Sequence, residues 1–171
     1  VRGIEHARLC RALDEPGWLT ARTLVFEAIK RKAPNESERD LFLNCERVEE
    51  LLGSITELTF NADSELDSLA PLTTLPRLQS LHLSHRPDLD KLGLPLLQSA
   101  PQLQSLTLIR SPLARPSLLL PLSHQLTELK LNHVGLTDLE FVRVFGRLRK
   151  LDVSSNPLRT LLPARGLTQL E

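Results

Sequence analysis

The stretch that most constrains the fold is residues 148–158, which read LRKLDVSSNPL. Apolar residues occupy its first, fourth, sixth and eleventh positions, and Asn156 occupies the ninth. Leu151 and Val153 alternate with Asp152, which predicts a short β-strand with one buried face. Asn156 follows where the chain turns, and its amide can hydrogen-bond backbone groups that the turn leaves unpaired. One such unit cannot bury its own apolar face, so we expect several units to stack.

The same pattern recurs upstream and begins once more near the end of the sequence. The six units start at Ile55, Leu78, Leu103, Leu126, Leu148 and Leu167. The intervals between these starts are 23, 25, 23, 22 and 19 residues, by subtraction of the residue numbers. The first two units close one residue late, at Leu66 and Leu89. Several matches in one frame are a strong signal, whereas a single L-x-x-L-x-L would be weak because leucine is common.

The asparagine position varies among the units. Only the fifth unit has asparagine there, and the first four have Asp63, Arg86, Ser111 and Val134. Aspartate and serine can still bond the backbone. Valine cannot, so the turn of the fourth unit must be satisfied by some other group.

In pattern and length these units resemble the leucine-rich repeat superfamily, whose repeats are roughly 20 to 29 residues long. The fourth and fifth units are similar to the short intracellular type of repeat. The resemblance covers about residues 55–171 and implies an α/β solenoid. This is the leucine-rich repeat horseshoe, a right-handed β-α superhelix whose strands line the concave side. We therefore expect residues 54–171 to form five full units and the start of a sixth.

The segments between the strands contain many prolines, which interrupt long helices. We expect short helical turns or 3₁₀ segments there, with residues 92–99 and 118–122 as candidates. Residues 138–145 contain no proline and have Asp138 near their start. They are the best candidate for a proper helix on the outer face.

Residues 1–53 do not repeat. Apolar spacing and breaker residues predict three helices, from Ile4 to about Pro16, from Thr20 to Pro34, and from a cap at Asn35 to Gly53. We expect this segment to be an N-terminal α-helical cap that covers the apolar flank of the first repeat. The alternative is a small helical recognition domain fused to the solenoid.

The two cysteines, Cys10 and Cys45, both fall at apolar positions of these expected helices. We expect buried free thiols in a reducing compartment, with a Cys10–Cys45 disulfide as the alternative. Extracellular proteins of the superfamily usually have a cysteine cluster in the N-terminal cap, and that cluster is missing here. The location expected is therefore cytoplasmic, with the nucleus as the intracellular alternative. The basic cluster Lys30–Lys32 is interpreted as a solvated helix end rather than a localisation signal.

Composition argues against several functional classes. The formal net charge is zero, so no bulk electrostatic attraction to nucleic acid or anionic membrane is indicated. No run of about 18 apolar residues is present to span a membrane. Phosphate-binding loops, G-x-S-x-G and H-E-x-x-H are missing. We therefore predict no enzyme activity and no cofactor.

Outward strand residues should align in columns on the concave face of the stack. His85, Arg110 and His133 share one column, and with His82 and Lys130 they form a mildly basic strip. A metal site is not expected, because His82 and His85 would face opposite sides of a strand unless the turn redirects one of them. The residues predicted to bind a partner are His82, His85, Thr107, Ile109, Arg110, Lys130, Asn132, His133, Asp152 and Ser154.

Ile109 places an apolar side chain within this polar strip, as in many protein-binding surfaces. We therefore predict a non-catalytic module that binds another protein through its concave face. One alternative is that these residues are solvated strand faces with no partner. Another is that the chain is the recognition part of a larger ubiquitin ligase, adaptor or bacterial effector whose catalytic domain lies beyond Glu171. The oligomeric state does not follow from the sequence.

Overall fold

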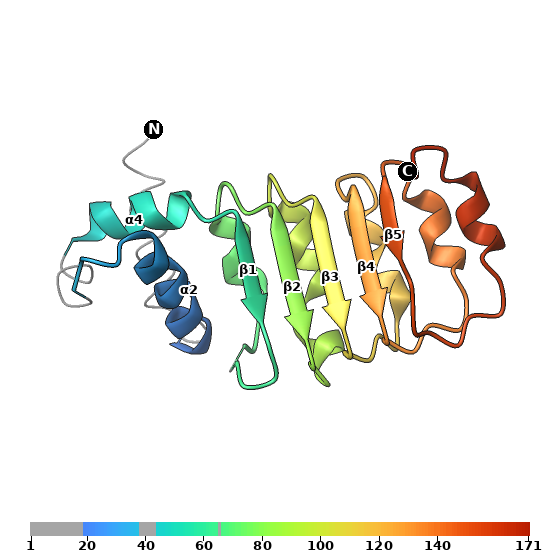
Figure 1. Ribbon diagram of the computed structural model, residues 1–171, viewed down its shortest axis with the longest axis horizontal. Helices are drawn as coiled ribbons and strands as arrows, with labels where there is room; N and C mark the ends of the chain where they lie inside the picture. Colours follow the sequence, from blue (N-terminus) through green and yellow to red (C-terminus); the bar gives the residue numbers. More distant parts are fainter. Residues whose placement is uncertain (1–18, 38–43, 65) are drawn as a thin grey trace.

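A computed structural model of the protein describes residues 19–37, 44–64 and 66–171. Within these residues, the helices α2 (Leu19–Lys32) and α4 (Cys45–Gly53) precede five short β-strands (Figure 1). The strands are β1 (Glu57–Phe60), β2 (Ser80–Ser84), β3 (Ser105–Ile109), β4 (Glu128–Asn132) and β5 (Lys150–Asp152).

The strands form one parallel sheet in sequence order, and each strand pairs only with its neighbours along the chain. The register places Leu58, Leu81, Leu106, Leu129 and Leu151 side by side. A helical return crosses behind the sheet between successive strands (Figure 1). The predicted α/β solenoid is therefore confirmed.

Leucines at the pattern positions form the core between the sheet and the returns. Leu81, Leu106 and Leu129 are fully buried on the inner side of their strands. Leu72 and Leu97 on the returns are fully buried opposite them. These side chains belong to one continuous cluster that runs from Phe26 to Leu167. The units are thus held together by apolar contacts that none of them could make alone.

All the returns in the described chain are 3₁₀ helices: η1 (Ala70–Thr74), η2 (Leu89–Lys91), η3 (Leu94–Ser99), η4 (Pro116–Leu122), η5 (Glu140–Val144) and η6 (Leu162–Gly166). The short segments predicted at 92–99 and 118–122 are confirmed. The proper helix expected at 138–145 is wrong, because η5 is 3₁₀. Adjacent strands are only about 4.8 Å apart, whereas an α-helix is about 10 Å wide. The narrower 3₁₀ form suits such closely spaced units.

The sixth unit opens three residues later than predicted. The backbone N–H of Glu171 donates to the carbonyl of Arg149 at 2.9 Å, just as Arg149 donates to Thr127 at 2.8 Å. Leu170 therefore corresponds to Leu148, and the interval becomes 170 − 148 = 22 residues. The sequence LTQL has the same L-x-x-L spacing as a unit start, but its first leucine ends the return. Pattern alone therefore placed the start too early.

The helices at the N-terminal end pack against the first repeat. Ile29 of α2 and Leu52 of α4 are buried in the same cluster as Ile55, which opens the first unit. The second expected helix is confirmed as α2. The third differs from the prediction, because α4 begins at Cys45 and its cap is Asn44 rather than Asn35. The first expected helix and residues 38–43 lie outside the described residues.

The expectation of a buried free thiol at Cys45 is wrong. The Cys45 side chain is exposed, and its sulfur is disulfide-bonded. As the first residue of α4, Cys45 lies one turn before Val48, where the helix enters the core. Cys10 lies outside the described residues. Disulfides persist mainly in oxidising compartments, so the argument for a reducing compartment no longer holds.

Side chains at the asparagine position bond the turn of the preceding unit. The Asn156 Oδ1 accepts the backbone N–H groups of Val134 and Gly135 at 3.0 Å and of Leu136 at 3.1 Å. Its Nδ2 donates to the carbonyl of Leu131 at 2.6 Å. The fifth unit thus supplies the partner that Val134 cannot provide for the fourth turn.

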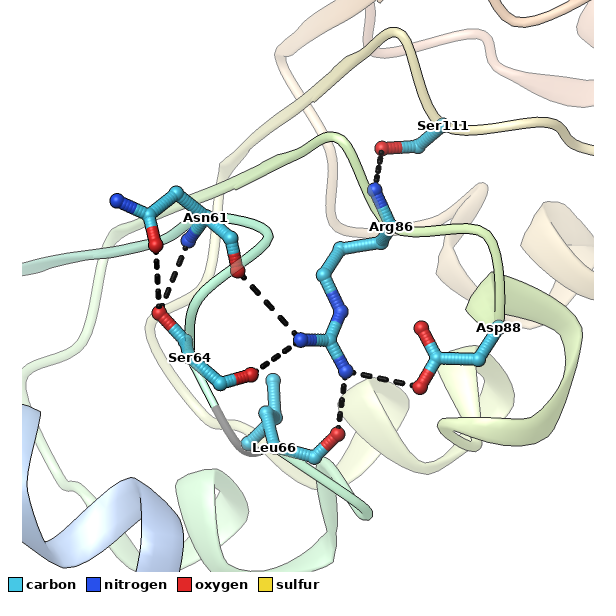
Figure 2. Close-up of polar contacts among 6 residues, drawn as sticks. All are labelled: Asn61, Ser64, Leu66, Arg86, Asp88 and Ser111. Atoms are coloured by element: carbon cyan, nitrogen blue, oxygen red, sulfur yellow. Dashed lines mark hydrogen bonds and ion pairs between the residues drawn. The ribbon is translucent and has the colours of Figure 1, made fainter.

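Arg86 plays the corresponding part for the first unit, and its side chain is buried (Figure 2). Its guanidinium donates to the carbonyls of Ser64 and Leu66 and to the Asp88 carboxylate, the last at 2.8 Å. The arginine side chain has N–H donors but no acceptor. Arg86 therefore bonds carbonyl and carboxylate oxygens, whereas Asn156 bonds both carbonyl oxygens and N–H groups. The N–H of Arg86 in turn donates to Ser111 Oγ at 3.0 Å. The chain of contacts therefore links three consecutive units.

We predict that Arg86→Gln lowers the free energy of unfolding by about 3–5 kcal/mol, because the Asp88 charge and the buried carbonyls lose their donor. Chemical denaturation would measure the loss. The control is Arg115→Gln, which removes an arginine 63% exposed and 3.6 Å from the Asp90 carboxylate. That change should lower the free energy of unfolding by less than about 1 kcal/mol. Equal losses in the two variants would contradict a structural role for the buried guanidinium.

Candidate functional site

The register aligns the outward residues of the strands as the sequence predicted. The central column contains His82, Thr107, Lys130 and Asp152, each paired with the next across the sheet. Thr107 is only 9% exposed, whereas Lys130 is exposed and His82 is half-buried. The middle of the face, at Thr107, is therefore closely packed, and the charged side chains lie around it.

The next column towards the carboxyl ends contains Ile109 and Asn132, followed by Ser154 just beyond β5. The Ile109 side chain is half-buried. The Asn132 Nδ2 donates to Ser154 Oγ at 2.6 Å, which joins two units at the surface. This column carries no charge.

The last column, here called the rim column, consists of His85, Arg110, His133 and Ser155. All four have left-handed backbone conformations, with φ of 55°, 47°, 54° and 58° in that order. Few residues other than glycine adopt such values. The strand alternation therefore ends before this column, and all four side chains are exposed. The turn thus redirects His85 relative to His82. Among the described residues, no group of three His, Cys, Asp or Glu side chains could hold a metal ion.

Backbone hydrogen bonds fix the rim column to the next unit. The N–H of His85 donates to the carbonyl of Ile109 at 2.9 Å, and that of Arg110 to Asn132 at 3.0 Å. The N–H of His133 donates to Ser154 at 3.2 Å. These bonds hold the backbone of three successive rim residues at the spacing of the strands. The sequence predicted the column but gave no signal for its backbone conformation.

The central column has charges of both signs. Lys130 Nζ lies 3.2 Å from the Glu128 carboxylate, a pair two residues apart on one strand that alternation could have revealed. Hydrogen bonds from Ser154, followed by the nearby Lys130 charge, lower the pKa of Asp152. Burial, followed by the Lys130 charge, lowers the pKa of His82.

Within the described residues, no helix is long and apolar enough to cross a membrane.

We predict that an NMR titration places the pKa of His82 below the ordinary histidine value of 6.5. Lys130→Gln should raise it part of the way back, because one of its two causes is removed, whereas Lys150→Gln should leave it unchanged. Because the pKa of His82 is lower in the folded protein than in the unfolded chain, the unfolded chain binds the proton at a higher pH. His82 therefore lowers stability as the pH falls below 6.5 towards the folded pKa. A His82 pKa at or above the ordinary value would contradict this arrangement.

No protein-family model and no curated protein matches the chain. Two similar solved structures are internalins from Listeria monocytogenes. Internalin C2 is 21% identical, with a TM-score of 0.60 over 86% of this chain and 60% of its own length. The internalin inlF is 22% identical, with a TM-score of 0.52 over 84% of this chain and 46% of its own length. The chain thus spans less than two thirds of either internalin, and the likeness shows that it has the leucine-rich repeat fold.

Proposed function

We propose that this protein is a non-catalytic module that binds another protein across the concave face of its β-sheet. The observation that carries the proposal is the rim column, where the backbone of three residues is bonded to the next unit while their side chains stay exposed. A backbone that is already fixed loses little conformational freedom when a partner binds, which favours affinity. The fold likeness to internalins is compatible with this proposal.

The surroundings of the rim column support the same function. Thr107 and Ile109 form a centre of low charge and low exposure, and Lys130 and Asp152 lie beside it. A poorly hydrated centre with a polar surround is the usual anatomy of protein interfaces. A solvated face without a partner would not require this separation.

The N-terminal segment is proposed to be a cap rather than a recognition domain, with the repeats occupying residues 54–171. Its buried residues Phe26, Ile29 and Leu52 share their cluster with the first repeat instead of forming a core of their own. In addition, Lys32 Nζ donates to Ser54 Oγ at 3.2 Å, which ties α2 to the start of the repeats.

The expected cytoplasmic location rested on two free thiols and on the missing cysteine cluster. At Cys45 the structure has the opposite state, a disulfide. The disulfide argues for an oxidising compartment instead.

The test is affinity capture of partners with the wild type and with Arg110→Glu/Lys130→Glu. We expect the captured partner to be lost with this variant, since the charges on the concave face are reversed. The matched control is Lys91→Glu/Arg165→Glu, which changes the same residue types on η2 and η6, outside the strands. The control should capture the partner as the wild type does. If the concave variant is folded by circular dichroism and still captures the partner, the concave face is not the binding surface.

A further inference from the structure

The acidic residues of the concave columns are confined to the strands, whereas basic residues also lie beyond the strand ends. The outward acidic residues Glu57, Glu128 and Asp152 all lie within the strands. The two columns at the carboxyl ends contain no acidic residue. The first consists of Asn61, Ser84, Ile109, Asn132 and Ser154, and the second consists of Ala62 followed by the four residues of the rim column. The residues of these two columns are therefore all basic or neutral.

Three donors stand in a row at this edge. Arg110 has five N–H donors and a permanent charge, and a histidine has at least one N–H donor in either protonation state. In the part of the chain that the structure describes, the side chains of His85, Arg110 and His133 form no ion pair with an acidic residue. Their exposed donors face solvent and can bind an external acceptor.

The spacing of these donors is set by the sheet. Adjacent parallel strands lie about 4.8 Å apart, so the row from His85 to His133 spans about 9.6 Å. The left-handed backbone at each position and its bond to the next unit keep the row in place. In an extended chain, alternate residues face one side at intervals of about 6.6 Å. Two carboxylates at alternate positions therefore fit within the row.

We propose that the rim column binds an extended segment of the partner protein that has Asp or Glu at alternate positions; this rests on the proposed function. One carboxylate accepts two N–H groups from the Arg110 fork, and the other accepts from a flanking histidine. Ile109, half-buried beside Arg110, offers apolar contact to the intervening part of the segment. Because the whole chain has zero net charge, the attraction comes from this edge rather than from the protein as a whole.

The test is fluorescence anisotropy at pH 7 with a labelled peptide of alternating serine and glutamate. The control peptide has glutamine in place of glutamate. The wild type should bind the glutamate peptide about tenfold more tightly than the glutamine peptide. Arg110→Gln should remove that preference, and so should Arg110→Gly, in which glycine tolerates the positive φ. The matched control Arg165→Gln, on η6, should retain it.

Equal affinity of the wild type for the two peptides would overturn the proposed acidic segment. So would an equal loss of binding in the Arg110→Gln and Arg165→Gln variants. If the peptides bind equally but the partner is still lost with Arg110→Glu/Lys130→Glu, only the chemistry assigned to the partner fails. Failure of the proposed function has a different signature, because capture then survives charge reversal on the concave face.

Discussion

The structure depends on hydrogen bonds that reach from the turn of one unit to the backbone of the unit before it. At the end of each strand the chain turns sharply, and some of its backbone groups are bonded by the unit that follows. Asn156 supplies both acceptor and donor to the fourth turn, and Arg86 supplies donors to the first. Apolar burial makes the units stack, but these polar contacts fix how one unit sits on the next.

The same turns create the surface that we assign to binding. Immediately after β2, β3 and β4, the backbone N–H of the rim residue bonds the neighbouring unit while its side chain stays exposed. The interior of a unit needs leucine at a few positions, but the outward positions tolerate many residue types. This explains how the chain shares a fold with internalins at 21% and 22% identity. It also explains why such a likeness says nothing about the residues of the concave face.

Much of this arrangement could be predicted from the leucine pattern alone. The pattern located the strands, their inner faces and the outward columns, because alternation and repeat length leave little choice. It missed the role of Arg86, since a charged residue is seldom buried and nothing local marks this one. It also missed the positive φ of His85, Arg110 and His133, because no glycine signals the end of the strand. Cys45 was misplaced because helical spacing does not show where a helix enters the core.

Amide hydrogen exchange by NMR, in the wild type and in Asn156→Ala, tests the dependence of one turn on the next unit most directly. We expect the amides of Val134, Gly135 and Leu136 to exchange at least about tenfold faster in the variant. His133 should follow them, because Asn156 also donates to the carbonyl of Ser154 that holds the His133 N–H. The amide of Arg110, one unit away, should be unchanged. Unaltered exchange in the fourth turn, or a uniform increase along all five strands, would contradict the account.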